Sequence, residues 1–132
     1  MKIVILGCGK VGTKLAESLL SDKHDVTLIE TDMEKCKLAA EELDTLVIHG
    51  NGTNTKTLEE AGIEDAQVFV AASAHDDTNL MASSIARDYK VPKIVSRLVD
   101  PKHETVFHEA GIDNLITPEK IVANHLKKII LD

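Results

Sequence analysis

Residues 2–30 read KIVILGCGKVGTKLAESLLSDKHDVTLIE. Residues 2–6 are almost entirely apolar, which is typical of a parallel strand buried on both faces. The glycines that follow have the GxGxxG spacing, and each meets a different need: a tight turn at Gly7, close approach of a pyrophosphate at Gly9, and close helix–strand packing at Gly12. Strand, glycine turn, helix and strand in this order predict a dinucleotide-binding unit.

The residues after the glycines support this prediction. Val11 and Leu15 begin an apolar stripe at helical spacing, and residues 25–29 form a second strand pattern that ends at Glu30. Glu30 follows Gly12 by 18 positions, close to the roughly 20 expected of the acid that binds a ribose. A carboxylate accepts hydrogen bonds from both ribose hydroxyls, whereas a 2′-phosphate would meet like charge and no flanking arginine. We therefore predict NAD(H) rather than NADP(H) as the ligand.

Length and composition narrow the function. A chain of 132 residues fits a single domain spanning 1–132, and is too short for a dinucleotide fold plus the substrate domain of a complete dehydrogenase. The net charge of -7 argues against nucleic acid as a partner. The two cysteines lack metal-ligand spacing, and we find neither a signal peptide nor a long apolar run. We expect a cytoplasmic domain without direct membrane insertion, peripheral to the membrane only through a partner.

Strand and helix patterns alternate along the whole chain, which predicts an α/β fold: a Rossmann-like, doubly wound sheet of about six parallel strands with helices on both faces. After the first two strands, the further strands are expected at 45–49, 67–72, 93–98 and 114–116. After the first helix, the further helices are expected at 32–43, 55–61, 76–89, 101–110 and 118–131, with Asp32 as an N-cap.

Ligands of such sheets bind outside the carboxyl ends of the strands. Residues 51–53 are expected beside the adenine, and Ser73 and Ala74 near the pyrophosphate or the nicotinamide ribose. Arg97 suits a phosphate through its planar guanidinium, the alternative being an arginine in surface ion pairs. The predicted cofactor-binding residues are Gly7, Cys8, Gly9, Lys10, Val11, Gly12, Glu30, Thr31, Asn51, Gly52, Thr53, Ser73, Ala74 and Arg97.

Other polar residues are open to alternative interpretations. The run His75-Asp76-Asp77 resembles a proton relay or metal corner, but acids at a helix start are ordinarily caps and dipole partners. Cys8 is either a redox-sensitive thiol at a helix N-terminus or a small residue tolerated in the turn. We predict no catalytic residues and no metal site.

A family resemblance covers nearly the whole chain. The ordered segments MKIVILGCGKVG, LIETD, VIHGNGTN, VAASAHDDTNLMASSIAR, SRLVDP and ITPEKIVAN resemble the N-terminal nucleotide-binding domain of TrkA-type potassium-uptake regulators, also called RCK-N or KTN domains. Asn51 departs from the family, which often has aspartate there. The resemblance implies a non-enzymatic domain that binds NAD(H), or in some members ATP or ADP, and assembles on the cytoplasmic face of a membrane potassium transporter or channel to control it. Family members usually continue into a further small ligand-binding domain, so the resemblance also implies that this is one domain of a longer chain.

Alternative functions from other classes are a fragment of an NAD-dependent oxidoreductase and a structural assembly domain with a vestigial nucleotide site. The last predicted helix carries a rich apolar stripe that includes Ile121, Val122, Leu126 and Ile129. Such a stripe either packs on the domain's own sheet or forms a homodimer or larger oligomer, for which exchange of helices is one route.

Overall fold

A parallel sheet forms the centre of the protein. The computed structural model of the chain covers residues 1–132. The strands are β1 (Lys2–Leu6), β2 (Asp25–Glu30), β3 (Leu46–His49), β4 (Val68–Ala71), β5 (Lys93–Arg97) and β6 (Asn114–Ile116). All six lie in one sheet in the order β3-β2-β1-β4-β5-β6, and every neighbouring pair is parallel. The strand order reverses between β1 and β4, which is the arrangement of a doubly wound fold.

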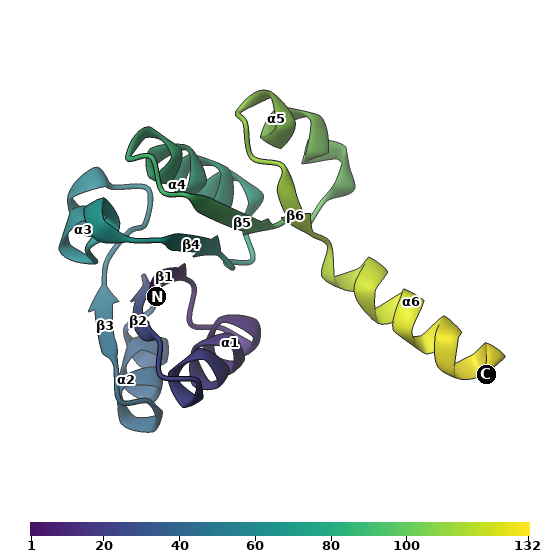
Figure 1. Cartoon of the computed structure of the whole chain (residues 1–132), viewed down its shortest axis with the longest axis horizontal. Coiled ribbons are helices and arrows are strands. Elements are labelled where there is room, and N and C mark those ends of the chain that lie inside the picture. The colour runs from purple at the N-terminus through teal and green to yellow at the C-terminus, as the bar shows by residue number, and fades with distance from the viewer.

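Helices cover both faces of this sheet (Figure 1). They are α1 (Lys10–Ser21), α2 (Met33–Glu42), α3 (Thr55–Glu60), α4 (Asp76–Asp88), α5 (Glu104–Glu109) and α6 (Pro118–Leu131), with 3-10 turns η1 at Ile63–Asp65 and η2 at Pro101–His103. Buried side chains of α1 and α2 pack against one face, and those of α3 and α4 pack against the other. The predicted Rossmann-like α/β fold is therefore confirmed.

The central strand β1 explains how the sheet holds the two helical layers together. Ile3 and Ile5 pack into the cluster beneath α1 and α2, whereas Val4 and Leu6 pack into the cluster beneath α3 and α4. All four side chains are at most 3% exposed. Because successive side chains of a strand point to opposite faces, an uninterrupted apolar run is what a strand covered on both faces requires.

The elements differ from the sequence prediction mainly at their ends. The strand expected at 67–72 is limited to 68–71, and the helix expected at 101–110 consists of η2 followed by α5. Pro101 stands at the first position of η2, and the Asp100 side chain caps the turn by accepting a hydrogen bond from the Lys102 N–H at 3.0 Å. A proline without an N–H and a capped tight turn favour 3-10 geometry before the helix proper begins.

The last helix leaves the body of the protein. In Figure 1, α6 projects away from the sheet, and no large set of contacts joins it to another element. Residues 119–132 are all exposed. The interpretation that this helix packs on its own sheet is therefore wrong. None of the helices is both long and apolar enough to span a bilayer.

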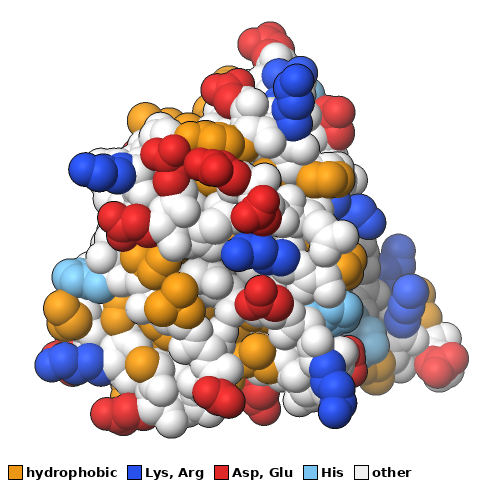
Figure 2. Space-filling model, turned by 60° about the vertical axis from the view of Figure 1, so that its left-hand side comes forward, with side chains coloured by type: hydrophobic (Ala, Val, Ile, Leu, Met, Phe, Trp, Pro, Cys, Tyr) orange, Lys and Arg blue, Asp and Glu red, His pale blue; other side chains and the backbone are white.

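Acidic and basic side chains are interspersed on the face drawn in Figure 2, with small apolar areas between them. Interspersed charges of both signs partly cancel at a distance, so this face carries no extended field of one sign.

Candidate functional site

A cleft of about 400 Å³ lies at the carboxyl ends of β1, β2, β4 and β5. Its walls come from the glycine loop after β1, the residues after β2, and the loops that follow β4 and β5. This is the point where the strand order reverses, which is where open α/β sheets bind ligands. The volume is within the range of small-molecule sites.

The glycine loop has the geometry that the sequence predicted. Gly7 has a φ of +109°, and a Cβ there would lie 3.0 Å from the carbonyl carbon of Ala72. A Cβ at Gly12 would overlap the carbonyl oxygen of Gly7, so α1 packs tightly against the loop. By contrast, nothing lies within 4 Å of a Cβ built on Gly9. Gly9 is also the N-cap of α1, with no side-chain cap, which leaves open space in front of N–H groups that favour an anion.

The Glu30 carboxylate is held in place by the backbone around it. Its Oε1 accepts the Cys8 N–H at 2.7 Å, and its Oε2 accepts the Asp32 N–H at 3.0 Å and the Thr31 hydroxyl at 3.4 Å. An ionised carboxylate offers about four lone-pair positions, so Oε1 keeps one for a further donor. Glu30 is therefore fixed at the edge of the cleft and able to accept a hydrogen bond from a ribose hydroxyl.

The loop after β4 is organised by Asn79. The Asn79 Oδ1 accepts the Ser73 N–H at 3.1 Å and the Ser73 hydroxyl at 2.7 Å, and its Nδ2 donates to the Ser73 carbonyl at 3.0 Å and the Arg97 carbonyl at 3.2 Å. The Ser73 hydroxyl also accepts the His75 N–H at 3.2 Å. The hydroxyl and the backbone N–H of Ser73 therefore both serve the loop itself, and Ser73 shapes the wall of the cleft.

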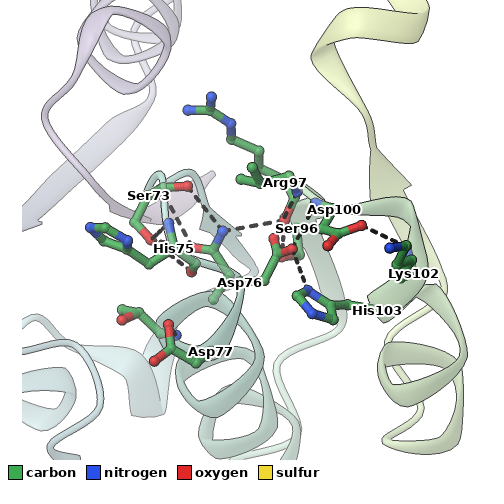
Figure 3. A network of polar contacts seen from close by, with 12 residues as sticks. Ser73, His75, Asp76, Asp77, Ser96, Arg97, Asp100, Lys102 and His103 are labelled. Atoms are coloured by element: carbon green, nitrogen blue, oxygen red, sulfur yellow. Dashed lines mark hydrogen bonds and ion pairs between the residues drawn. The ribbon is translucent and has the colours of Figure 1, made fainter.

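Arg97 lines the cleft from the end of β5. Its side chain extends away from the network of polar contacts in Figure 3, and its buried Nε has no hydrogen-bond partner. None of the ion pairs in the structure involves Arg97. A buried donor without a partner is costly in a folded protein. The side chain therefore suits an anionic ligand, and the surface ion pairs considered as the alternative are not formed.

Most of the residues predicted from sequence are brought together in this cleft, namely Gly7, Gly9, Glu30, Thr31, Asn51, Gly52, Ser73, Ala74 and Arg97. Cys8 and Lys10 instead line a neighbouring groove between α1 and α2. Val11 is half exposed on α1, and Gly12 is buried beneath it. The Thr53 hydroxyl donates to the side chain of Asn51 at 2.8 Å; Thr53 supports this turn without lining the cleft.

Sequence reasoning missed several cleft residues, namely Leu6, Ile29, Asp32, Lys35, Ala72 and Thr78, whereas His75 lines the cleft from the loop after β4, among the strand-end residues expected there. Lys35 and Thr78 lie in the first turns of α2 and α4, and a helix that starts after a strand places its first turn beside that strand's end. This signal was available in the predicted element boundaries. Lys35 also brings a cation to the Glu30 edge, so the absence of a flanking arginine does not by itself disfavour a 2′-phosphate.

Cys8 does not have the properties of a reactive thiol. Burial, followed by the negative charge of Glu30, raises the pKa of Cys8 to about 12. The thiolate is the nucleophilic form, so it is scarce at neutral pH. The raised pKa favours the interpretation that Cys8 is a small residue tolerated in the turn.

Both acids after His75 lie in the first turn of α4, as expected of dipole partners, but Asp76 does not cap this helix. The Asp76 carboxylate turns toward the loop after β5, where it accepts the N–H groups of Val99 at 2.7 Å and Asp100 at 2.8 Å. It also pairs with His103 Nδ1 at 2.8 Å (Figure 3). The structure contains no group of three or more His, Cys, Asp or Glu side chains placed to hold a metal ion.

Comparison with known proteins identifies the family. Residues 3–118 match the model of the TrkA-N domain. The chain belongs to the TrkA-N domain family. It is 52% identical over 130 residues to a Trk system potassium uptake protein TrkA homologue from Methanothermobacter thermautotrophicus, a match that covers 98% of this chain and 60% of that relative. This TrkA-N domain therefore spans well under the full length of the relative.

Solved structures share the fold. The GsuK channel bound to NAD superposes with a TM-score of 0.84 at 20% identity, covering 95% of this chain and 23% of that one. GsuK bound to ADP gives a TM-score of 0.83 at 20% identity, with coverage of 95% and 33%. The Shewanella denitrificans Kef CTD in its AMP-bound form gives 0.80 at 23% identity, with coverage of 99% and 81%.

Proposed function

We propose that this TrkA-N domain binds NAD(H) in the cleft and is the non-enzymatic, nucleotide-responsive part of a regulator of a potassium transporter or channel. It acts at the inner face of the membrane through contact with that partner. The observation that carries the proposal is the combination, in one cleft, of an open helix N-terminus at Gly9, a fixed acid at Glu30 and an unpartnered cation at Arg97. The potassium-uptake relative supports the physiological role.

The cleft suggests how the ligand lies. The Glu30 carboxylate accepts a hydrogen bond from a hydroxyl of the adenosine ribose, and the pyrophosphate lies in the open space at Gly9. The other end of the ligand reaches Ala74 and Arg97. No Phe, Tyr or Trp side chain lines the cleft, which supports packing of the adenine against aliphatic side chains and backbone. ATP or ADP would use the same adenosine contacts, with terminal phosphates directed at Arg97; the NAD, ADP and AMP bound by structural relatives support both ligand classes.

Signalling by a bound nucleotide requires differential binding. A ligand shifts a conformational equilibrium only by as much as its affinities for the two states differ. NADH and NAD⁺ differ at the nicotinamide, which this orientation directs toward the loops after β4 and β5. Discrimination between the two redox forms would therefore arise there.

Isothermal titration of the chain with NADH, NAD⁺, ATP, ADP and AMP in turn tests the site. We expect Glu30→Ala to weaken binding roughly tenfold or more, because a hydrogen bond to a charged group is lost. Glu34→Ala is the matched control, since Glu34 is an exposed acid on α2 outside the cleft. Gly9→Val should also weaken binding, because its side chain would fill the space in front of α1.

Each of the following results would overturn part of this proposal. Absence of binding by all five nucleotides, or equal affinity in Glu30→Ala and Glu34→Ala, would reject the cleft as the site and favour a structural domain with a vestigial pocket. Equal affinity for NADH and NAD⁺, with the same structure of the protein bound to each, would show that the domain does not distinguish the two redox forms. Consumption of NADH with added carbonyl substrates would favour an oxidoreductase fragment.

A further inference from the structure

We infer that Asp76 and Asn79, in the first turn of α4, are positioning residues that couple the nucleotide cleft to the part of the chain that carries α6. The role of nucleotide as the input rests on the proposed function. The coupling itself rests on two sets of buried hydrogen bonds made by this turn. One set joins it to the border of the cleft, and the other joins it to the loop after β5.

Asn79 holds the cleft side. It is 0% exposed, and its amide uses both donors and both acceptor positions on Ser73 and Arg97. These are the residues at the ends of β4 and β5 that border the cleft. A ligand that shifts either of them must therefore move Asn79 with it or leave buried polar groups unpaired, which is costly.

Asp76 joins the same turn of α4 to the loop that follows β5. It lies three positions before Asn79, so both project from neighbouring places on α4. Its buried carboxylate fixes the N–H groups of Val99 and Asp100 and pairs with His103. These partners are 23 to 27 positions away in sequence and begin the segment 98–117, which leads through η2, α5 and β6 into α6. A shift of α4 is thus passed directly to the start of this segment.

The segment 98–117 can respond as a unit. Leu98, Phe107 and Ile112 form a small apolar cluster that is distinct from the two main clusters, although Leu80 of α4 and Ile94 of β5 pack against it. An open surface pocket of about 180 Å³ between α4 and α5 is lined by residues of both helices, including Asp76 and Phe107. This space allows α5 to move relative to α4 without overlapping the main core.

Hydrogen exchange of the full chain with and without saturating NADH tests the coupling. The readout is the amides of Leu98 and Ile112, which bond to the carbonyls of Ile116 and Phe107 and not to Asp76. In the wild type, NADH should change their exchange rates. In Asp76→Asn, NADH should still bind, because Asp76 lies outside the cleft, but the change at these two amides should be lost.

His103→Ala provides a second variant whose folding is not at risk, since the His103 side chain is 52% exposed. It should reduce the NADH response, because one support of Asp76 is removed. His108→Ala is the matched control: this histidine also pairs with carboxylates, Glu104 and Asp113, but has no contact with Asp76. An NADH response in both Asp76→Asn and His103→Ala equal to that of the wild type would overturn the coupling.

A third comparison needs no ligand, and therefore separates the coupling from the proposed function. Asn79→Asp places a carboxylate oxygen against the carbonyls of Ser73 and Arg97, and should speed exchange of the same two amides by about tenfold. Ser84→Ala, which removes a hydroxyl bonded only within α4, should not. If NADH fails to bind, the proposed ligand is wrong; if Asn79→Asp leaves both amides unchanged, the coupling is wrong.

Discussion

The Asp76 carboxylate is stabilised in its ionised form by groups that are distant in sequence, including His103. Burial opposes ionisation of Asp76, but hydrogen bonds from the N–H groups of Val99 and Asp100 and from His103 outweigh it and hold the pKa of Asp76 below its usual value. The hydrogen bond to Asp76, aided by the charges of Asp100 and Asp77, raises the pKa of His103. The ion pair is therefore favoured over a wider pH range than two isolated groups would allow.

This pairing predicts a pH-dependent stability. The contribution of His103 is fully present below its unfolded pKa of 6.5 and is lost as pH rises through its raised folded value. The contribution of Asp76 is present above 3.8 and is lost as pH falls through its lowered folded value. As the pH rises from about 6 to 8.5, the free energy of unfolding measured in urea should fall less in His103→Ala than in the wild type. An unchanged pH slope would contradict the ion pair.

At the scale of elements, local signals set where helices begin. Asp32 was predicted as the N-cap of α2, and its Oδ1 accepts the N–H groups of Glu34 at 2.9 Å and Lys35 at 3.2 Å. Asp32→Ala should lower the free energy of unfolding by about 1 kcal/mol. Asp22→Ala is the control, because Asp22 stands at the C-cap of α1, where a negative charge is unfavourable. Equal stability of the two variants in urea would show that the cap is not formed.

At the scale of the whole molecule, α6 is the part that lacks a partner. Its apolar residues Ile121, Val122, Leu126, Ile129, Ile130 and Leu131 are 52% to 76% exposed. Large exposed apolar stripes usually mark an interface, and an isolated helix of 14 residues is marginal in water. A second copy of this chain, covering α6 in a homodimer or larger oligomer, would supply the missing burial.

The substitution Leu126→Glu tests whether α6 forms such a homodimer or larger oligomer. Light scattering should show a dimer or larger species for the wild type and a monomer for this variant, because a charge would be buried in the apolar interface. Asn124→Glu adds the same charge on the opposite side of α6 and should leave the assembly intact. A wild-type chain that remains monomeric at all concentrations would reject the dimer.

Features set by neighbouring residues were predictable. The apolar run 2–6, the glycine spacing and the Asp32 cap each act over a few positions, and they specified the strand–turn–helix–strand unit of residues 2–30 and the glycine loop of the cleft. Lys35 could also have been predicted, because its place in the first turn of α2 follows from the element boundaries. Arg97 was placed at a strand end correctly, but its unpartnered Nε depends on packing from several elements.

The sequence by itself determined that this chain forms a doubly wound sheet with a glycine loop, because periodicity and turn chemistry are local properties of the chain. Only the tertiary structure decided the partners of Asp76, which lie 23 or more positions away, and the detachment of α6. Both depend on which surfaces meet in space. A hydrophobic pattern specifies that a face is to be covered, but the packing of the whole chain decides what covers it.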